Sequence, residues 1–340
     1  MPDGRFLHIA SYVNDIRYSL LEKLLASKDE FISGGPIAES LGVSRVSIKN
    51  HVDQLVSGGY QITAIRNRGY RLEQEPETFH EIGFRIHCAG QLPEAHLYCY
   101  EHVDSTNVEV DRLLNDGADA PVVVISATQS SGKGRRGNRW ESHLGENLYL
   151  SVGFRPWIET AFIGQYTLWI GIFIAEFLRE HTGLDMKVKW PNDLYVNGKK
   201  VAGILSEAKI DTDHIQHLII GVGLNINAPA DQFPEELRKK ATSLRTELGT
   251  SLSFNKLASA IASIIVEQSH RYFKKPLNSE IQEKWEQFDF LKGRKVVAKR
   301  GHNPVSGIAN GIDSDGHLLI RLDNGENCAV NSGEVTMAFE

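Results

Sequence analysis

Four cations and three glycines between Ser131 and Trp140 form the segment with the clearest chemical character in this sequence. The segment reads Ser-Gly-Lys-Gly-Arg-Arg-Gly-Asn-Arg-Trp. Its glycines allow the backbone to approach a ligand closely and to adopt positive φ. Its guanidinium groups can hold a phosphate or a carboxylate through two parallel hydrogen bonds. The pattern indicates a loop that binds an anion, and a mobile, solvated basic loop is the alternative at this point.

Two common phosphate-binding motifs do not account for this loop. It contains G-x-G-x-x-G, but a dinucleotide-binding fingerprint opens a helix after its strand. Here the β-branched run Val122–Ile125 precedes the loop and a second β-like run, Asn147–Val152, follows it, so the loop joins two predicted strands. A Walker A loop requires Ser or Thr after its Gly-Lys pair, and this chain has Gly134 there.

Other polar clusters that could do chemistry lie elsewhere in the middle of the chain. A Ser-Thr-Asn turn is often a helix cap, a lysine beside a hairpin turn is usually solvated, and a tryptophan is often part of a core. Each cluster therefore also has an ordinary structural interpretation. The clusters are Asp104-Ser105-Thr106-Asn107, Lys189-Trp190-Pro191-Asn192-Asp193, Lys200 and Gly221-Val222-Gly223-Leu224-Asn225.

Composition restricts the possible classes of protein. The chain has 340 residues, of which 41% are hydrophobic, so it can form two or three domains with apolar cores. Its net charge of −6 restricts any nucleic-acid contact to a local basic patch. Three cysteines without a C-x-x-C pair fit a reducing compartment and argue against a disulfide scaffold or a zinc site.

Neither a signal peptide nor a membrane span is expected. The N-terminus lacks the apolar core of a signal peptide. The longest apolar run, residues 168–178, is interrupted by Gly171 and Glu176 and is too short to cross a bilayer. We therefore expect a soluble, cytoplasmic protein without a membrane partner.

The first 75 residues have the pattern of a winged helix-turn-helix domain. Apolar residues at helical spacing follow Asp15, and Pro36 suits the first position of a short second helix. Ser44 is the predicted N-cap of a third helix, which ends near Ser57. Two β-like runs joined by the basic tip Arg66-Asn67-Arg68-Gly69 then predict a hairpin, the wing.

A three-helix packing domain is the alternative interpretation of this region. The polar outer face of the third helix and the basic wing favour DNA binding, in which a helix reads base edges and other side chains contact phosphates. The residues predicted to contact DNA are Ser44, Arg45, Ser47, Lys49, Asn50, Arg66 and Arg68.

Strands and helices alternate after an acidic, proline-containing segment, residues 73–77, which predicts a linker. Residues 162–179 predict a largely buried apolar helix. Residues 186–207 predict a hairpin with its turn at Asn197-Gly198. Beyond residue 291, short β-like runs predict a small β-barrel of about 50 residues. These runs cover 295–298, 305–309, 318–322 and 335–337, with turns at Asp315-Gly316 and Asn324-Gly325.

With these clusters in this order, the chain resembles the biotin–protein ligase family over nearly its whole length. The Lys-Trp-Pro-Asn-Asp block and the Gly-x-Gly-Arg-Arg-Gly-x-x-Trp loop are the specific motifs, whereas the helix-turn-helix and the β-barrel are common to many families. The N-terminal winged helix makes the chain similar to the bacterial bifunctional form, which combines the ligase with the repressor of the biotin operon.

The resemblance implies an α+β multidomain fold. It comprises a winged helix-turn-helix DNA-binding domain over 1–75, a class II synthetase-like α/β catalytic domain that binds biotin and ATP over 76–290, and an SH3-like β-barrel over 291–340. The implied reaction joins biotin and ATP into biotinyl-5′-AMP and pyrophosphate. The biotinyl group then passes to a lysine of the biotin carboxyl carrier protein of acetyl-CoA carboxylase. Mg²⁺ is expected because a triphosphate is split.

The resemblance also assigns residues to these steps. Catalysis falls to Arg135, Lys189, Asp193 and Lys200, with Asp193 a candidate for orienting the acceptor lysine or a metal whose ligands stay unknown. Biotin binding falls to Ser105, Thr106, Asn107, Gln129, Gly132, Lys133, Gly134, Arg135 and Lys200. ATP and adenylate binding falls to Arg135, Arg136, Arg139, Trp140, Asn192 and Asn225, with Trp140 packed on adenine and Asn225 bonded to its edge.

One position departs from the family pattern, because Lys133 stands where relatives often have arginine. Its charge is kept and its planar fork is lost, so slightly looser retention of the adenylate is expected. The regulatory expectation is that the adenylate orders the loops, that the central domains pair sheet to sheet into a homodimer which binds operator DNA, and that the carrier protein competes for that surface. Three other interpretations stay open: a ligase whose winged helix does not repress, a non-catalytic biotin-sensing DNA-binding regulator, and a lipoate or octanoate ligase.

Overall fold

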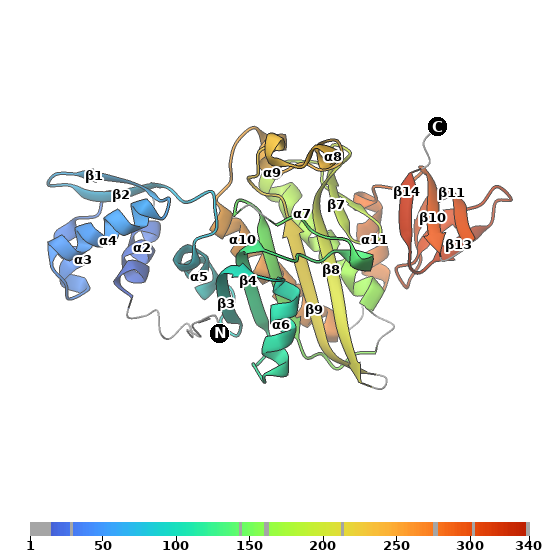
Figure 1. Cartoon of the computed structure of the whole chain (residues 1–340), viewed down its shortest axis with the longest axis horizontal. Helices are drawn as coiled ribbons and strands as arrows, with labels where there is room; N and C mark the ends of the chain where they lie inside the picture. Colours follow the sequence, from blue (N-terminus) through green and yellow to red (C-terminus); the bar gives the residue numbers. More distant parts are fainter. Residues whose placement is uncertain are drawn as a thin grey trace.

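Three bodies follow one another along the chain, with the winged helix and the C-terminal sheet at opposite ends of a large central sheet (Figure 1). The structure is a computed structural model. It describes residues 15–27, 30–142, 145–159, 163–211, 214–274, 278–300 and 303–337. Residues 1–14 of the predicted first domain, and Phe162 at the start of the predicted apolar helix, lie outside the described residues.

The N-terminal body is the predicted winged helix. It contains α2 (Ile16–Ala26), α3 (Gly34–Ser40) and α4 (Arg45–Ser57), followed by the antiparallel hairpin of β1 (Gln61–Ile65) and β2 (Gly69–Gln74). Local signals begin the helices, since Asp15 accepts a hydrogen bond from the Arg17 backbone and Ser44 accepts one from the Ser47 backbone at 3.1 Å. The apolar positions Leu20, Leu21, Leu24, Ile48, Val52 and Leu55 are buried together.

The central body is built on a seven-stranded sheet with the order β3-β4-β5-β9-β8-β7-β6. Only the pair β3–β4 is parallel, and the other neighbours are antiparallel. The strands are β3 (His96–Val103), β4 (Val122–Gln129), β5 (Leu148–Phe154), β6 (Lys187–Lys189), β7 (Asp193–Val196), β8 (Lys199–Asp211) and β9 (His214–Leu224).

Helices cover both faces of this sheet, and the alternation along β4 separates the two packing layers. Val122 and Val124 pack under α6 (Thr106–Asn115), while Val123 and Ile125 join the large core on the other face. The helices α7 (Ile163–Thr182), α10 (Phe254–Lys274) and α11 (Asn278–Phe288) pack on that second face (Figure 1). The short α8 (Glu235–Arg238) and α9 (Leu244–Leu248) lie beyond the end of β9.

The C-terminal body is a five-stranded antiparallel sheet with the order β13-β12-β11-β10-β14. Its apolar residues are continuous with the core of the central body. The strands are β10 (Lys295–Arg300), β11 (Asn303–Ile312), β12 (Leu318–Arg321), β13 (Asn327–Val330) and β14 (Glu334–Met337). The short strand β13 was not predicted from the sequence.

Two other features differ from the sequence prediction. The first arm of the 186–207 hairpin is broken by a turn at Trp190-Pro191-Asn192, so that β6 and β7 are separate antiparallel strands. The helix α5 (Glu81–Ala89) was not predicted, and it contributes Ile82 to the winged-helix core and Phe84 and Cys88 to the central core. None of the described helices is both long enough and apolar enough to cross a membrane.

The expected linker is held firmly by the central body. The Glu77 carboxylate accepts a 2.6 Å hydrogen bond from Ser251 and is paired with Arg245 at 3.3 Å, and its carbonyl accepts from Asn227. Glu75 lies 2.6 Å from His87 of α5. The segment between the winged helix and the sheet is therefore fixed in place rather than free.

Candidate functional site

The basic loop lies over the end of the central sheet and covers a cavity that opens to solvent. The loop is held as a small hairpin, because Trp140 N donates to Gly132 O at 2.9 Å and Gly134 N donates to Asn138 O at 2.7 Å. Arg136 adopts φ of 57°, in the left-handed region, and its side chain joins the wall of the cavity. The turn 190–192, β8, β9 and β14 complete the wall.

Uncharged polar groups form one end of the cavity, at the start of α6. Thr106 N donates to Gln129 Oε1 at 2.8 Å, and Gln129 Nε2 donates to Ser142 Oγ at 2.9 Å. The Ser151 hydroxyl, from β5, lies 2.7 Å from Thr106 Oγ1 and 2.6 Å from Asn107 Oδ1. These side chains are buried and held by one another, so they present fixed donors and acceptors to a small uncharged polar group.

Two glycines of β9 make room for the side chains of this cavity. A Cβ on Gly221 would lie 2.1 Å from Asn107 Oδ1, and a Cβ on Gly223 would lie 2.4 Å from Trp140 Cε2. Both glycines are on the same face of the strand because they are two residues apart. The absence of a side chain at Gly221 therefore makes room for Asn107 at the uncharged polar end, and its absence at Gly223 makes room for the Trp140 indole.

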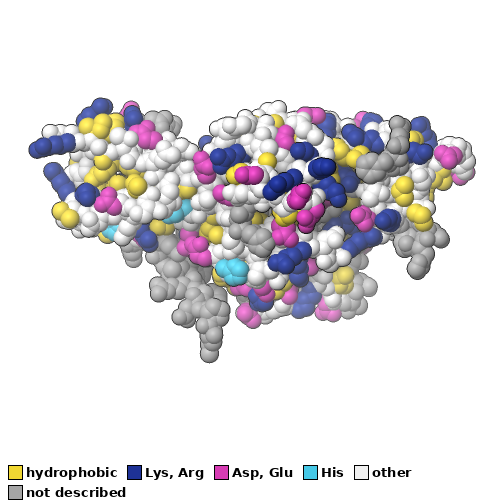
Figure 2. Space-filling model, turned by 45° about the horizontal axis from the view of Figure 1, so that its top comes forward, with side chains coloured by type: hydrophobic (Ala, Val, Ile, Leu, Met, Phe, Trp, Pro, Cys, Tyr) yellow, Lys and Arg dark blue, Asp and Glu magenta, His cyan; other side chains and the backbone are white. Residues whose placement is uncertain are grey.

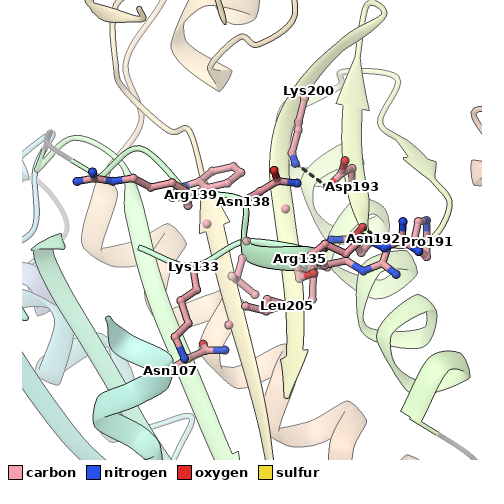
Figure 3. A pocket seen from close by; sticks show the side chains of 18 of the residues that line it. Asn107, Lys133, Arg135, Asn138, Arg139, Pro191, Asn192, Asp193, Lys200 and Leu205 are labelled. Atoms are coloured by element: carbon pink, nitrogen blue, oxygen red, sulfur yellow. Dashed lines mark hydrogen bonds and ion pairs between the residues drawn. The ribbon is translucent and has the colours of Figure 1, made fainter. Parts of the chain in front are cut away.

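The cations Arg135, Lys189 and Lys200 line the other end of the cavity, and Figure 3 shows Arg135 and Lys200 on the side away from Asn107. Lys200 Nζ lies 2.7 Å from Asp193 Oδ1 and 5.2 Å from the centre of the Trp140 ring. Arg135 Nη1 donates to Asn192 Oδ1 at 3.4 Å. Burial lowers the pKa of Lys189, and burial together with the neighbouring Arg136 lowers the pKa of Arg135. An anionic ligand would offset the cost of burying these two positive charges, since an opposite charge favours the charged form of each group.

The structure brings most of the predicted ligand-binding residues to this one cavity. Gly132 and Asn225 are the exceptions. Gly132 is packed against Gln129 and Ser142 at the base of the loop, and the Asn225 amide donates to Thr242 O at 2.9 Å within the protein. Those lining the cavity are Ser105, Thr106, Asn107, Gln129, Lys133, Gly134, Arg135, Arg136, Arg139, Trp140, Lys189, Asn192, Asp193 and Lys200.

Several groups of the site were not found from the sequence. Ser151 and Glu207 are on strands without a recognisable motif, and their contacts with Asn107 depend on strand register. Glu334 of β14 also lines the cavity and contributes a negative charge near Lys189. Only the docking of the C-terminal sheet brings it there. A polar residue within an otherwise buried strand run, as at Ser151, was the one available signal.

The predicted DNA-contact residues form an exposed surface on the N-terminal body. Arg45, Lys49 and Asn50 are exposed on α4, and Lys49 pairs with Asp53 at 3.3 Å. The Ser44 side chain caps the helix by accepting a hydrogen bond from the Ser47 backbone, and the Ser47 side chain is half-buried. Arg66 and Arg68 are exposed on the wing tip, where Arg68 stacks over Phe31 at 4.6 Å. Figure 2 shows Lys and Arg side chains at the free end of this body and on the central body.

The carboxylates of the cavity fit a magnesium ion that arrives with a nucleotide better than a resident metal. Within the described lining, the acidic side chains are Asp193, which is paired with Lys200, and Glu334. The described part of the chain offers one group of three metal-ligand types, Asp313, Asp315 and His317, and it does not line this cavity. Mg²⁺ is commonly held by one or two carboxylates together with substrate phosphates.

Three parts of the chain match known protein families. Residues 100–225 match the biotin/lipoate A/B protein ligase family, and residues 17–71 match a helix-turn-helix domain. Residues 293–337 match the biotin protein ligase C-terminal domain. The third match favours a biotin ligase over a lipoate ligase.

Relatives of known name share this organisation along nearly their whole length. The bifunctional ligase/repressor BirA of Bacillus subtilis is 31% identical over 312 residues, which cover 91% of this chain and 95% of that protein. BirA of Escherichia coli is 33% identical over 302 residues, covering 88% of this chain and 91% of that protein. The structure of biotin protein ligase from Aquifex aeolicus in complex with biotin and ATP has 28% identity and a TM-score of 0.62, and it aligns with 71% of this chain and 99% of its own. This chain belongs to the biotin protein ligase family, and its helix-turn-helix groups it with the bifunctional ligase/repressors.

Proposed function

We propose that this chain is an ATP-dependent biotin–protein ligase that also represses biotin synthesis genes in response to biotin. The observation that carries the ligase proposal is the pairing of two chemistries in one cavity. A fixed, uncharged polar end suits the ureido ring of biotin, and a cluster of Arg135, Lys189 and Lys200 suits the carboxylate and the phosphates. Biotin and the α-phosphate of ATP would meet between these ends.

In the first step the biotin carboxylate attacks the α-phosphorus of ATP. A carboxylate–phosphate bond forms, the bond to pyrophosphate breaks, and pyrophosphate leaves with the electron pair. Two anions approach each other in this step, so fixed cations lower the barrier by stabilising the charge of the transition state. Arg135 and Lys200 are the proposed contacts of the reacting groups, with Lys189, Arg136 and Arg139 toward the phosphates.

In the second step the amine of an acceptor lysine attacks the acyl carbon of biotinyl-5′-AMP. A C–N bond forms, the acyl–phosphate bond breaks, and AMP leaves as the amine loses a proton. Asp193 is the proposed group that orients the incoming amine, since its carboxylate already holds an ammonium group, that of Lys200, at 2.7 Å. Mg²⁺ with the nucleotide supplies further charge neutralisation, and Asp193 and Glu334 are the carboxylates proposed to hold it.

Closure of the basic loop is proposed to shield the adenylate from water. The loop carries Trp140 and the exposed side chains of Lys133, Arg136 and Arg139. Trp140 Nε1 is buried and has no acceptor among the described residues, so it is available to a ligand. The Trp140 ring is the proposed contact for adenine.

The acceptor protein and a second copy of the chain are proposed to share one surface, the open edge of β8. The pairing of β7 with β8 ends at Gly203, whereas β8 continues to Asp211. In the described structure no strand pairs with the outer side of residues 205–211, and Ile210 there is 51% exposed. An unpaired edge can bind a strand of another chain. The biotin carboxyl carrier protein of acetyl-CoA carboxylase is the proposed acceptor, and homodimerisation follows adenylate binding.

The remaining parts of the proposal concern DNA, location and domain limits. The exposed side chains Arg45, Lys49, Asn50, Arg66 and Arg68 support binding to operator DNA. Free cysteines support a cytoplasmic location. The proposed domain limits are 1–75, 76–290 and 291–340, in keeping with the ends of β2 and α11.

Incubation of the purified chain with labelled biotin, ATP, Mg²⁺ and a carrier domain tests the ligase. Label should appear on the carrier, and a carrier with its acceptor lysine replaced by arginine should stay unlabelled. Binding of biotin without ATP-dependent pyrophosphate release would indicate a sensor instead. Gel shifts on DNA upstream of the biotin synthesis genes, with and without biotin plus ATP, test repression. Equal affinity in both conditions would leave a ligase whose winged helix does not repress.

A further inference from the structure

Glu207 of β8 contacts both the uncharged polar end of the cavity and the basic loop. Its Oε2 accepts a hydrogen bond of 2.7 Å from Asn107 Nδ2, and its Oε1 lies 3.5 Å from Lys133 Nζ. Figure 3 shows Lys133 extending from the loop toward Asn107. Lys133 and Asn107 belong to separate segments, and the carboxylate is the group that joins them.

The carboxylate sets the orientation of the Asn107 amide. An ionised carboxylate can only accept hydrogen bonds, so Asn107 must present its Nδ2 to Glu207. The Asn107 carbonyl is then directed at Ser151 Oγ, 2.6 Å away. The space at Gly221 admits this arrangement, because a Cβ there would lie 2.1 Å from Asn107 Oδ1. Asn107 is only 4% exposed, so a reversed amide would leave buried groups without partners.

The same network continues to the far end of the basic loop. Ser151 lies 2.7 Å from Thr106 Oγ1, the Thr106 backbone donates to Gln129, and Gln129 donates to Ser142. Ser142 Oγ donates to Trp140 O at 3.0 Å. Glu207 thus holds the start of the loop directly, through Lys133, and reaches its end through the side chains that form the polar end of the cavity.

We propose that Glu207 is a positioning residue for biotin: it fixes the orientation of the Asn107 amide and holds the basic loop in place through its ion pair with Lys133. The proposal rests on the proposed ligase function. The two contacts differ in strength. The bond to buried Asn107 is short and charge-assisted. The pair with Lys133 is partly exposed, since the two side chains are 46% and 39% accessible, so it contributes less and is screened by salt.

Two substitutions at Glu207 separate these contacts. Glu207→Gln retains an acceptor for Asn107 Nδ2 and removes the charge that faces Lys133. Glu207→Ala removes both. We expect Glu207→Ala to raise the Kd for labelled biotin about tenfold or more, which is the loss of one charge-assisted hydrogen bond. Glu207→Gln should keep the biotin Kd within about threefold of wild type and speed release of the adenylate two- to threefold, the range of a partly exposed ion pair.

A double-mutant cycle with Lys133→Met tests whether the ion pair between Glu207 and Lys133 holds the loop. Adenylate is formed in the site from labelled biotin and ATP, and its release is followed after addition of excess unlabelled biotin. Lys133→Met should speed release in the wild-type background and have no further effect in Glu207→Gln. A merely structural role of Glu207 would give independent, multiplicative effects. Glu283→Gln, a matched change at an exposed carboxylate of α11, should behave as wild type.

The possible results distinguish the role of Glu207, its contact with the loop and the proposed ligase function. If wild type binds biotin and Glu207→Ala stays within twofold of it in biotin Kd and release rate, the assignment of Glu207 is wrong and the ligase proposal stands. If Lys133→Met has the same effect on adenylate release in wild type and in Glu207→Gln, the ion pair between Glu207 and Lys133 does not hold the loop. If wild type itself binds no biotin, the proposed function fails. Thermal unfolding of each variant identifies a folding defect. If Glu207→Ala is unstable, Glu207→Gln and its double-mutant cycle with Lys133→Met test the proposal.

Discussion

Trp190 Nε1 donates a 3.0 Å hydrogen bond to the carbonyl of Gly316, a residue 126 positions further along the chain. Trp190 is in the turn between Lys189 and Asp193, and Gly316 is in the turn between β11 and β12 of the C-terminal sheet. Gln165 of α7 supports the same turn by donating to Ser314 O at 2.7 Å. The C-terminal sheet therefore helps to hold the segment that carries two of the proposed catalytic side chains.

Trp190→Phe should destabilise the protein and weaken its use of ATP. The change leaves the buried Gly316 carbonyl without its donor, at a cost of about 1–3 kcal/mol, and the smaller ring adds a cavity. We expect a lower midpoint in urea unfolding and a raised KM for ATP. Trp157→Phe, at a side chain that is 82% exposed, is the control and should change stability by less than about 0.5 kcal/mol. Equal stability of the two variants would contradict this account.

Gly221→Ala and Gly223→Ala should affect different substrates. An added Cβ at 221 meets Asn107, at the proposed biotin end, and one at 223 meets Trp140, at the proposed adenine end. We expect Gly221→Ala to raise the Kd for biotin about tenfold and Gly223→Ala to raise mainly the KM for ATP. Gly164→Ala on α7, where a Cβ meets nothing within 4 Å, is the control. Impairment of the same substrate in both variants would show that the two ends are assigned wrongly.

Lys200→Ala and Asp193→Asn should slow different steps of the reaction. Removal of one preorganised charge from a reacting centre typically costs 10²–10³-fold in rate, or about 3–4 kcal/mol. We expect Lys200→Ala to lose this much in adenylate formation, measured by pyrophosphate release in a single turnover. Asp193→Asn should slow transfer from preformed adenylate more than it slows adenylate formation. Asp116→Asn, an exposed carboxylate after α6, should change neither step. Equal slowing of adenylate formation and of transfer in Asp193→Asn would contradict the proposed role of Asp193 in orienting the acceptor amine.

Short-range signals in the sequence were sufficient for much of the fold. Ser44 caps α4 through a local contact, and the continuous β-branched run Val122–Ile125 lies within β4. The hairpin turn at Asn197-Gly198 is likewise local, with φ values of 49° and 78°. These features need no distant partner, and the sequence predicted each of them.

Features that depend on contacts between distant segments were missed. The helix α5 buries Ile82 in one core and Phe84 and Cys88 in another, so its sequence does not show a single apolar stripe. The turn at Trp190 is held by Gly316, and Glu207 reaches Asn107 only through the register of the sheet. The basic loop and the polar clusters were found because they are motifs, whereas the groups that orient them were not.

Arg66→Ala and Arg68→Ala should weaken DNA binding in a salt-dependent way. Both side chains are exposed at the wing tip and are proposed to contact phosphates. Each lost phosphate contact reduces the slope of log K against log salt by about 0.9. Binding of a labelled random-sequence duplex, measured at several salt concentrations, provides the slope. Lys239→Ala, an exposed lysine outside the winged helix, is the control. A slope unchanged in both wing variants would exclude the wing from the interface.

Acidification should loosen the contact between the winged helix and the central body through His80. Its ring packs edge-on against buried Tyr60 with 4.9 Å between the ring centroids, and its backbone donates to Asn255 of α10 at 2.9 Å. Burial and nearby Arg17 lower the pKa of His80 below its ordinary value of 6.5. The neutral form is favoured in the folded protein, and the unfolded chain takes up a proton at higher pH than the folded one. The stabilising contribution is therefore complete above about pH 6.5 and is lost as pH falls through that value toward the folded pKa.

His80→Asn should remove this pH dependence while retaining a residue suited to begin α5. Urea unfolding of wild type and variant at pH 7.5 and pH 5.0 provides the comparison. We expect wild type to lose more free energy of unfolding than the variant between these pH values, because only wild type carries the lowered pKa of His80. The other histidines are common to both proteins, so the difference between the two pH slopes isolates His80. Identical slopes would mean that His80 does not contribute to the pH dependence of this interface.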